Sequence, residues 1–268
     1  MAIRVVMAGA TGWVGKALIP AIMAADDLEL AGAVARSAAG KDSGEVVGHL
    51  VNGVMVAGTL EEALGVPSDV VVDYTKPDAV KRHALLSVEK GRHVVIGTSG
   101  LGAADYAEID KAARAAGVGV LAAGNFSITA TLLKRFALMA AKYVPDVEVI
   151  DYASAGKPDA PSGTARELAE ALADIRGKST AVPQAEVSGV PGTRGGAVGA
   201  GGGVQVHALR LPSYILSCEA QFGLPDERLT IRHDAGSSAA PYVAGTLLAV
   251  REVVKIKGLV RGLDALME

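Results

Sequence analysis

Three glycines directly after the first apolar segment constrain the fold of this chain more than any other feature. Residues 3–8 form a short apolar run, typical of a β-strand that is buried on both faces. The run is followed by Gly9-Ala10-Thr11-Gly12-Trp13-Val14-Gly15 and then by apolar residues at helical spacing. Glycine in such a turn lets backbone N–H groups approach a pyrophosphate, and the start of the helix adds partial positive charge. The segment predicts a dinucleotide-binding turn, although a turn that only packs the helix on the strand would also need glycine.

The N-terminal half continues with strand-like and helical segments in alternation. Strands are expected at residues 28–35, 70–73, 93–97 and 118–122, and helices at residues 13–25, 78–90 and 104–116. Strands that alternate with helices indicate a parallel sheet with right-handed crossovers. The sequence therefore predicts an α/β fold whose first domain, residues 1–125, is a Rossmann-type doubly wound sheet that binds the dinucleotide.

After residue 125 the pattern changes. Helices are expected at residues 128–143 and 164–175, and strands at residues 147–153, 204–211, 215–222 and 229–233. Thr164 and Glu167 have the spacing of a capping box at a helix start. The closely spaced strands predict an α+β substrate-binding and oligomerisation domain, residues 126–236, with a mixed, largely antiparallel sheet. A last helix at 241–255, ended by Gly258, is expected to return residues 237–268 to the first domain.

Composition excludes several functional classes. The chain has 268 residues with 26 basic and 29 acidic side chains, a balance that argues against a general nucleic-acid binder. A single cysteine, Cys218, permits no intrachain disulfide, and the five histidines show no metal-ligand spacing, so no metal is expected. No apolar run reaches the roughly 18 residues that cross a bilayer. We expect a cytoplasmic protein that does not bind membranes.

The end of the second expected strand indicates which dinucleotide binds. Val34-Ala35-Arg36-Ser37 offers no carboxylate for a ribose 2′-hydroxyl but does offer Arg36 for a 2′-phosphate. We therefore expect NADPH to be preferred over NADH, with a solvated surface arginine as the alternative. The strand ends at residues 97–100 and 122–126 should lie near the nicotinamide half, because ligands bind at the carboxyl edge of such sheets.

The most distinctive run is Lys157-Pro158-Asp159-Ala160-Pro161-Ser162-Gly163-Thr164-Ala165. A helix is expected to begin near Ser162, and the first N–H groups of a helix have no partners within it. Together with the hydroxyls of Ser162 and Thr164 and the charge of Lys157, they predict a site for a carboxylate or phosphate. Simple N-capping of the helix is the alternative, and it needs only one hydroxyl.

Taken together, these segments resemble the dihydrodipicolinate reductase family of the lysine and diaminopimelate pathway over nearly the whole chain. The matching runs are residues 9–15, 72–77, 95–100, 125–127, 157–165, 207–212 and 229–234. The resemblance implies hydride transfer from NADPH or NADH to a small unsaturated dicarboxylate, in a homotetramer assembled through the second-domain sheet. It also implies that cofactor contacts come from Gly9 to Val14, Gly97, Thr98, Ser99, Ala123, Asn125 and Phe126, and substrate contacts from Lys157, Gly163 and Thr164.

One departure from the family pattern concerns the proton donor. The family carries a His-His pair before the lysine, whereas this chain has Ala153 and Ser154. Because a positioned general acid contributes roughly 10²–10⁴-fold, its loss would slow the reaction without abolishing hydride transfer. Three functions stay open: the family reaction with Lys157 or Ser154 as donor, a sister reductase for another imine or conjugated unsaturated acid, and a catalytically silent NAD(P)-binding sensor.

Overall fold

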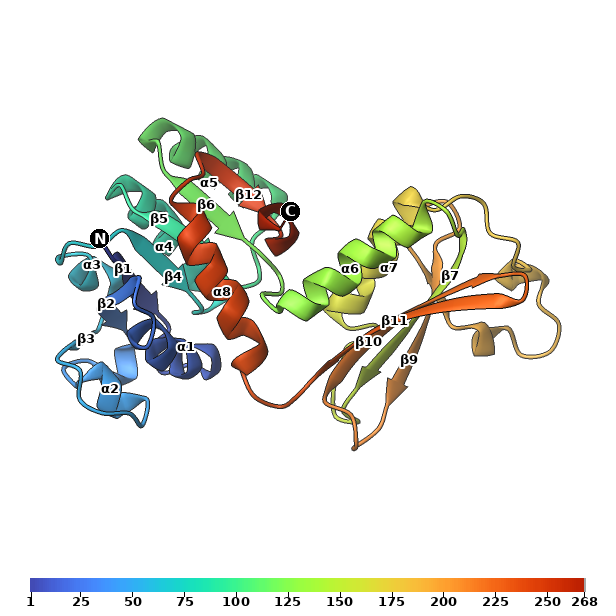
Figure 1. The fold of residues 1–268 in the computed structure, drawn as a ribbon, viewed down its shortest axis with the longest axis horizontal. Helices are drawn as coiled ribbons and strands as arrows, with labels where there is room; N and C mark the ends of the chain where they lie inside the picture. The colour runs from blue at the N-terminus through green and yellow to red at the C-terminus, as the bar shows by residue number, and fades with distance from the viewer. Residues whose placement is uncertain (268) are drawn as a thin grey trace. The chain divides into compact units, whose positions relative to one another are not determined.

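The computed structural model describes residues 1–267, and the chain divides into two compact units (Figure 1). The first unit comprises Met1–Ile128 together with the chain from Ala239 onward, and the second comprises Thr129–Ser238. Within the described residues, no helix is both long and apolar enough to span a membrane.

The first unit is built on a seven-stranded sheet in which every neighbouring pair is parallel, in the order β12-β6-β5-β4-β1-β2-β3. The part β3-β2-β1-β4-β5-β6 has the strand order of a Rossmann fold, and it confirms the predicted fold class. The strands are β1 (Ile3–Ala8), β2 (Leu28–Val34), β3 (Val56–Ala57), β4 (Val70–Asp73), β5 (His93–Ile96), β6 (Gly119–Ala122) and β12 (Gly258–Arg261).

Helices cover both faces of this sheet, which explains why most residues of its strands are apolar. In β1, Val5 and Met7 lie in a core that includes Leu18 of α1, whereas Val6 packs with Leu60 of α3. The last helix, α8, packs beside α1 and over β5 and β6, so the chain does return to the first unit (Figure 1). The helices are α1 (Trp13–Met23), α2 (Ser43–Val46), α3 (Leu60–Ala63), α4 (Pro77–Glu89), α5 (Ala103–Ala116) and α8 (Ala240–Val253).

The C-terminal segment corrects one expectation. Gly258 does not stop a helix, because α8 ends at Val253 and Gly258 begins strand β12. Its φ of +86° suits glycine, and its N–H donates to the Val118 carbonyl at 2.9 Å. A four-residue strand at the sheet edge carries too few alternating positions to stand out in the sequence.

The second unit contains a five-stranded sheet in the order β11-β10-β7-β9-β8, covered by α6 and α7. Only the β7–β9 pair is parallel, so the sheet is mixed and largely antiparallel, as predicted. Val147 and Val149 of β7 pack against Leu168 and Leu172 of α7. The elements are α6 (Ile128–Ala141), β7 (Asp146–Ala153), α7 (Gly163–Ile175), β8 (Gly196–Val198), β9 (Val204–Arg210), β10 (Leu216–Leu224) and β11 (Glu227–Ala235).

Candidate functional site

The turn between β1 and α1 depends on glycine for close packing. Gly9 has a φ of +92°, and a Cβ there would lie 2.2 Å from the Tyr74 carbonyl oxygen. A Cβ on Gly15 would lie 2.3 Å from the Gly9 carbonyl oxygen. Packing therefore accounts for Gly9 and Gly15, while Gly12 stands at the N-terminus of α1, where helical N–H groups are left without helical partners.

A cavity of about 430 Å³ opens at the carboxyl edge of the first unit's sheet. Four predicted cofactor residues line it, namely Gly9, Thr11, Gly12 and Arg36. The remaining walls come from the chain after β2, the start of α3 and the turn after β4. A concave site bounded by the glycine turn and by backbone at a helix start has the form that binds a nucleotide.

Two further cations at this cavity were not singled out from the sequence. Lys76 and Arg82 line it together with Arg36, and Arg82 pairs with Glu61 at 2.5 Å. The sequence could have indicated Lys76, because this residue follows the strand that ends at Asp73. Ligands of such sheets bind in the crevice at the carboxyl ends of the strands. Arg82 lies inside helix α4, where an exposed arginine carries no such signal.

The predicted residues after β5 lie beside a buried carboxylate at the end of β4. Asp73 is 1% exposed and accepts hydrogen bonds from the Thr98 hydroxyl at 2.6 Å and the Thr75 hydroxyl at 2.7 Å. His83 Nδ1 of α4 lies 2.8 Å from the other carboxylate oxygen. The Thr75 N–H in turn donates to the Thr98 oxygen at 2.7 Å. Thr98 thus joins two loops through Asp73, and it does not line the cavity.

These contacts determine the ionisation of Asp73. Burial by itself raises the pKa of a carboxyl group, but hydrogen bonds from His83, Thr98 and Thr75 outweigh it, and the pKa of Asp73 falls below its ordinary value. The carboxylate is therefore charged at neutral pH and holds the turn after β4 against the turn after β5.

Aromatic side chains form the support beneath the same edge. The Tyr74 ring lies edge-on to Phe126 with centroids 5.9 Å apart, and its hydroxyl is 2.8 Å from the Thr246 hydroxyl. A Cβ on Gly97 would lie 2.2 Å from that ring, so only glycine fits there. Phe126 is 1% exposed, which makes it a core residue. Tyr74 was not singled out as a site residue from the sequence.

The other predicted cofactor residues differ in solvent exposure. Trp13 is 56% exposed, with its ring centroid 5.6 Å from that of Tyr242. Ala10 and Ala123 are buried, Val14 and Ser99 are more accessible, and Asn125 Oδ1 accepts a hydrogen bond from the Ser127 N–H at 2.8 Å. None of these six predicted residues lines the 430 Å³ cavity.

In the second unit the predicted substrate residues belong to the segment that leads into α7 and to its first turn. Lys157 Nζ lies 2.7 Å from the Asp159 carboxylate, and the Lys157 N–H donates to the Ser154 carbonyl at 3.0 Å. Gly163, the first residue of α7, is exposed, and a Cβ there would meet nothing within 4 Å. Ala153 is buried at the end of β7.

The capping box expected at Thr164 and Glu167 is wrong. Helix α7 starts at Gly163, and Ser162 is its N-cap, whose hydroxyl oxygen accepts a hydrogen bond from the Ala165 N–H at 3.4 Å. Thr164 is then the second residue of the helix and cannot cap it. Ser162 and Thr164 both carry hydroxyl groups that could cap the helix, and the capping-box spacing to Glu167 indicated Thr164 instead of Ser162.

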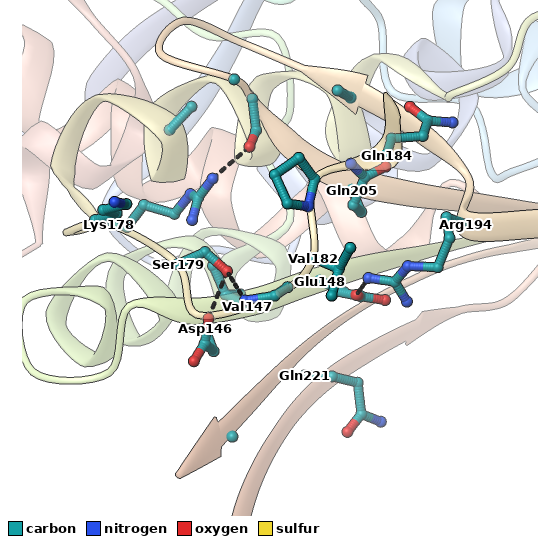
Figure 2. A pocket seen from close by; sticks show the side chains of 18 of the residues that line it. Asp146, Val147, Glu148, Lys178, Ser179, Val182, Gln184, Arg194, Gln205 and Gln221 are labelled. Atoms are coloured by element: carbon teal, nitrogen blue, oxygen red, sulfur yellow. Dashed lines mark hydrogen bonds and ion pairs between the residues drawn. The ribbon is translucent and has the colours of Figure 1, made fainter. Parts of the chain in front are cut away.

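A larger cavity of about 890 Å³ lies in the second unit and contains none of the predicted site residues (Figure 2). Asp146 and Glu148 of β7 line it, and they alternate with the valines that face the helices. Glu148 pairs with Arg194 and lies 2.7 Å from His207 Nε2. Glu148 and His207 lie on the sheet face opposite to the helix-covered core, and Val147 and Phe222 of that core also line the cavity.

Cys218 is a buried, free cysteine of the second unit. Burial raises the pKa of the Cys218 thiol to about 12, which makes it a poor nucleophile at neutral pH. Among residues 1–267, no group of three His, Cys, Asp or Glu side chains could hold a metal ion.

Comparison with known proteins identifies the family. The family model "Dihydrodipicolinate reductase, N-terminus" matches residues 3–126, and its C-terminal counterpart matches residues 129–267. The chain belongs to the dihydrodipicolinate reductase family. This membership confirms the resemblance and the prediction of an NAD(P)H-dependent oxidoreductase.

Individual relatives match along their whole length. The 4-hydroxy-tetrahydrodipicolinate reductase of Synechococcus elongatus is 41% identical over 99% of this chain and 98% of its own. That of Desulfitobacterium hafniense is 38% identical over 99% of both chains. The dipicolinate-bound dihydrodipicolinate reductase of Paenisporosarcina sp. TG-14 has a TM-score of 0.85, with 31% identity over 99% of both chains.

The Asp73 cluster leads to a pH prediction. The folded pKa of Asp73 is below the unfolded value of about 3.9, so its contribution to stability is present above pH 4 and is lost as the pH falls through the folded pKa. Asp73→Asn should lower stability at pH 7 by about 2 kcal/mol, and its difference from the wild type should shrink below about pH 4. Thermal unfolding between pH 7 and pH 3 measures both, with the exposed Asp26→Asn as control. A constant difference across this range would contradict the role of Asp73.

Proposed function

We propose that this chain is an NADPH-preferring reductase that transfers hydride to a small carboxylated imine or conjugated unsaturated acid. The nearest named activity is 4-hydroxy-tetrahydrodipicolinate reduction, by which its relatives are named. The observation that carries the proposal is Lys157, which precedes the exposed start of α7 by six residues in a member of this reductase family. A protein that only sensed the dinucleotide would not need a site for a substrate anion.

The first unit is the dinucleotide-binding domain in this proposal, and its residues fit that group. The turn at Gly9 and Gly12 has no side chains that would block a phosphate, and it lines a cavity with Arg36, Lys76 and Arg82. Three cations suit a phosphorylated ligand, and no acidic side chain follows β2 to bind a ribose hydroxyl. A bound reduced nicotinamide would supply the hydride.

The second unit is the substrate-binding domain. Lys157 offers a full positive charge, and the N–H groups at Gly163 and Thr164 stand at the positive end of α7. A substrate carboxylate would compete with Asp159 for the Lys157 ammonium group, since the two now form an ion pair at 2.7 Å. Binding at this point orients the acceptor by its acid group and leaves its unsaturated carbon free to react.

The proton that completes the reduction must come from a group other than the family's imidazoles. Ala153 is buried, and its methyl group has no acidic proton to transfer. Lys157 and Ser154 are therefore the proposed donors, directly or through water. The same replacement favours a second candidate function, a sister reductase for a different imine. A preformed iminium accepts hydride without prior protonation and has less need of a general acid.

We also propose that the second unit carries the subunit contacts of a homotetramer. The face of its sheet opposite to α6 and α7 bears Glu148 of β7 and His207 of β9, and Arg194 from the segment before β8 pairs with Glu148. Such a face suits contact with another copy through ion pairs and hydrogen bonds.

Arg36 provides the test of cofactor preference. Arg36→Ala should weaken NADPH binding about tenfold or more, because a hydrogen bond to a charged group contributes about 1.5–3 kcal/mol, and should leave NADH binding unchanged. Fluorescence titration with each dinucleotide measures this. Lys41→Ala removes an exposed charge outside the cavity and serves as control. Equal loss of affinity for NADPH and NADH would remove Arg36 from this role.

Lys157 provides the test of the reaction. In an NADPH-oxidation screen over cyclic carboxylated imines, with 4-hydroxy-tetrahydrodipicolinate as benchmark, Lys157→Ala should lower kcat/KM about 10- to 100-fold and leave the KM for NADPH unchanged. Lys142→Ala, which removes an exposed charge of the same unit, should match the wild type.

The outcomes of the screen separate the candidates. Turnover of the benchmark supports the family reaction, and turnover of another imine alone supports the sister reductase. Tight NADPH binding without turnover of any compound would contradict both and would leave a sensor. Normal turnover by Lys157→Ala would contradict the anion site.

A further inference from the structure

Asp151 is a fully buried carboxylate that the proposed chemistry does not use. It lies in β7 with a side chain that is 0% exposed, and it is surrounded by donors from the loop before α7. Its Oδ1 accepts from the Ser162 hydroxyl at 2.6 Å, and its Oδ2 accepts from the Ser162 N–H at 2.8 Å. Because a buried charge is costly unless it is paired, these contacts fix the position of Ser162 strongly.

Arg210 completes the pairing and reaches a second point of the same loop. One of its nitrogens, Nη2, lies 2.8 Å from Asp151 Oδ2 and 2.7 Å from the Asp159 carbonyl oxygen. Its Nη1 donates to the Leu209 carbonyl at 2.9 Å, which holds the guanidinium against its own strand. Strands β7 and β9 are neighbours, with Asp151 opposite Ala208, so the rigid sheet carries both members of the pair.

The two anchored points lie within the segment that binds substrate in the proposed function. Asp159 stands two residues after Lys157, and Ser162 stands directly before Gly163. The Ser162 hydroxyl has a single proton, which it donates to Asp151, while its oxygen accepts from the Ala165 N–H. This hydroxyl therefore has no proton to donate to a ligand. The direct contact with an anion that the sequence predicts for Ser162 gives way to an indirect role.

We infer that Asp151 and Arg210 are positioning residues that act through Ser162 and Asp159 to hold the anion-binding loop, residues 157–164, in its receptive shape. The inference rests on the proposed function and adds the reason why the loop is ordered before a ligand arrives. Preorganisation of this kind raises affinity because the loop loses no further freedom on binding. Ser162 serves as the connection between the buried pair and α7.

The test uses Ser162→Ala in the full-length protein, with dipicolinate as the probe, because a related enzyme binds it. Loss of the hydroxyl removes one contact to Asp151 and the cap of α7, and dipicolinate binding should weaken about tenfold or more by calorimetry. NADPH affinity should not change, because the first unit is untouched. Ser162→Thr keeps a hydroxyl and should restore tight dipicolinate binding.

Ser179→Ala is the matched control. The Ser179 hydroxyl also donates to a carboxylate of β7, that of Asp146. Ser179, however, follows the end of α7, whereas Ser162 precedes its start. Ser179→Ala should leave dipicolinate affinity unchanged even where it lowers the thermal unfolding midpoint. Equal affinity of Ser162→Ala and the wild type would overturn the inference, as would an equal loss in Ser162→Ala and Ser179→Ala. A wild-type protein that neither binds dipicolinate nor reduces any imine would instead refute the proposed function, and the inference with it.

Discussion

A carboxylate buried away from water must be surrounded by hydrogen-bond donors, and each unit of this chain uses that requirement to fix a functional loop. In the first unit Asp73 ends β4 and gathers Thr75, Thr98 and His83. In the second unit Asp151 gathers Ser162 and Arg210. In both cases a strand carries the carboxylate, and at least one donor comes from a loop: Thr75 and Thr98 in the first unit and Ser162 in the second. Each loop is thereby fixed to the sheet.

The two proposed binding sites do not depend on the residues at the reacting centre, and they can therefore tolerate changes there. In the proposed function, phosphate recognition depends on glycine packing at Gly9 and Gly15, and carboxylate recognition depends on the start of α7. Neither requires an imidazole. In that proposal, Ala153 and Ser154 in place of the family's histidines change the supply of the proton and leave both recognition elements in place. Divergence confined to that step is the expected route to a different imine substrate on an unchanged scaffold.

Much of the fold could be predicted from the sequence because its signals are local. A buried strand followed directly by a glycine turn and a helix has few alternatives. The bounds of β4 follow from three consecutive valines followed by Asp73. The short edge strands β3, β8 and β12 were missed because they carry no period.

The site was harder to predict because its partners are distant in sequence. Asp73, at the end of β4, and Asp151, inside β7, resemble ordinary strand residues until the fold places Thr98 and Arg210 beside them. Arg82 is indistinguishable from a solvated helix residue until α4 packs beside the nucleotide turn. Spacing along the chain could identify candidate donors such as Ser162 and Thr164, but only the position of Asp151 shows which of them caps α7.

The central claim is that the chain moves a hydride from a dinucleotide to an acceptor held by its acid group. The most direct measurement is mass spectrometry of the product formed from NADPH that carries deuterium on one or the other face of nicotinamide C4. The account predicts one deuterium in the reduced carboxylated product from one labelled face and none from the other. Oxidation of NADPH without transfer of deuterium from either face, in the presence of saturating acceptor, would contradict it.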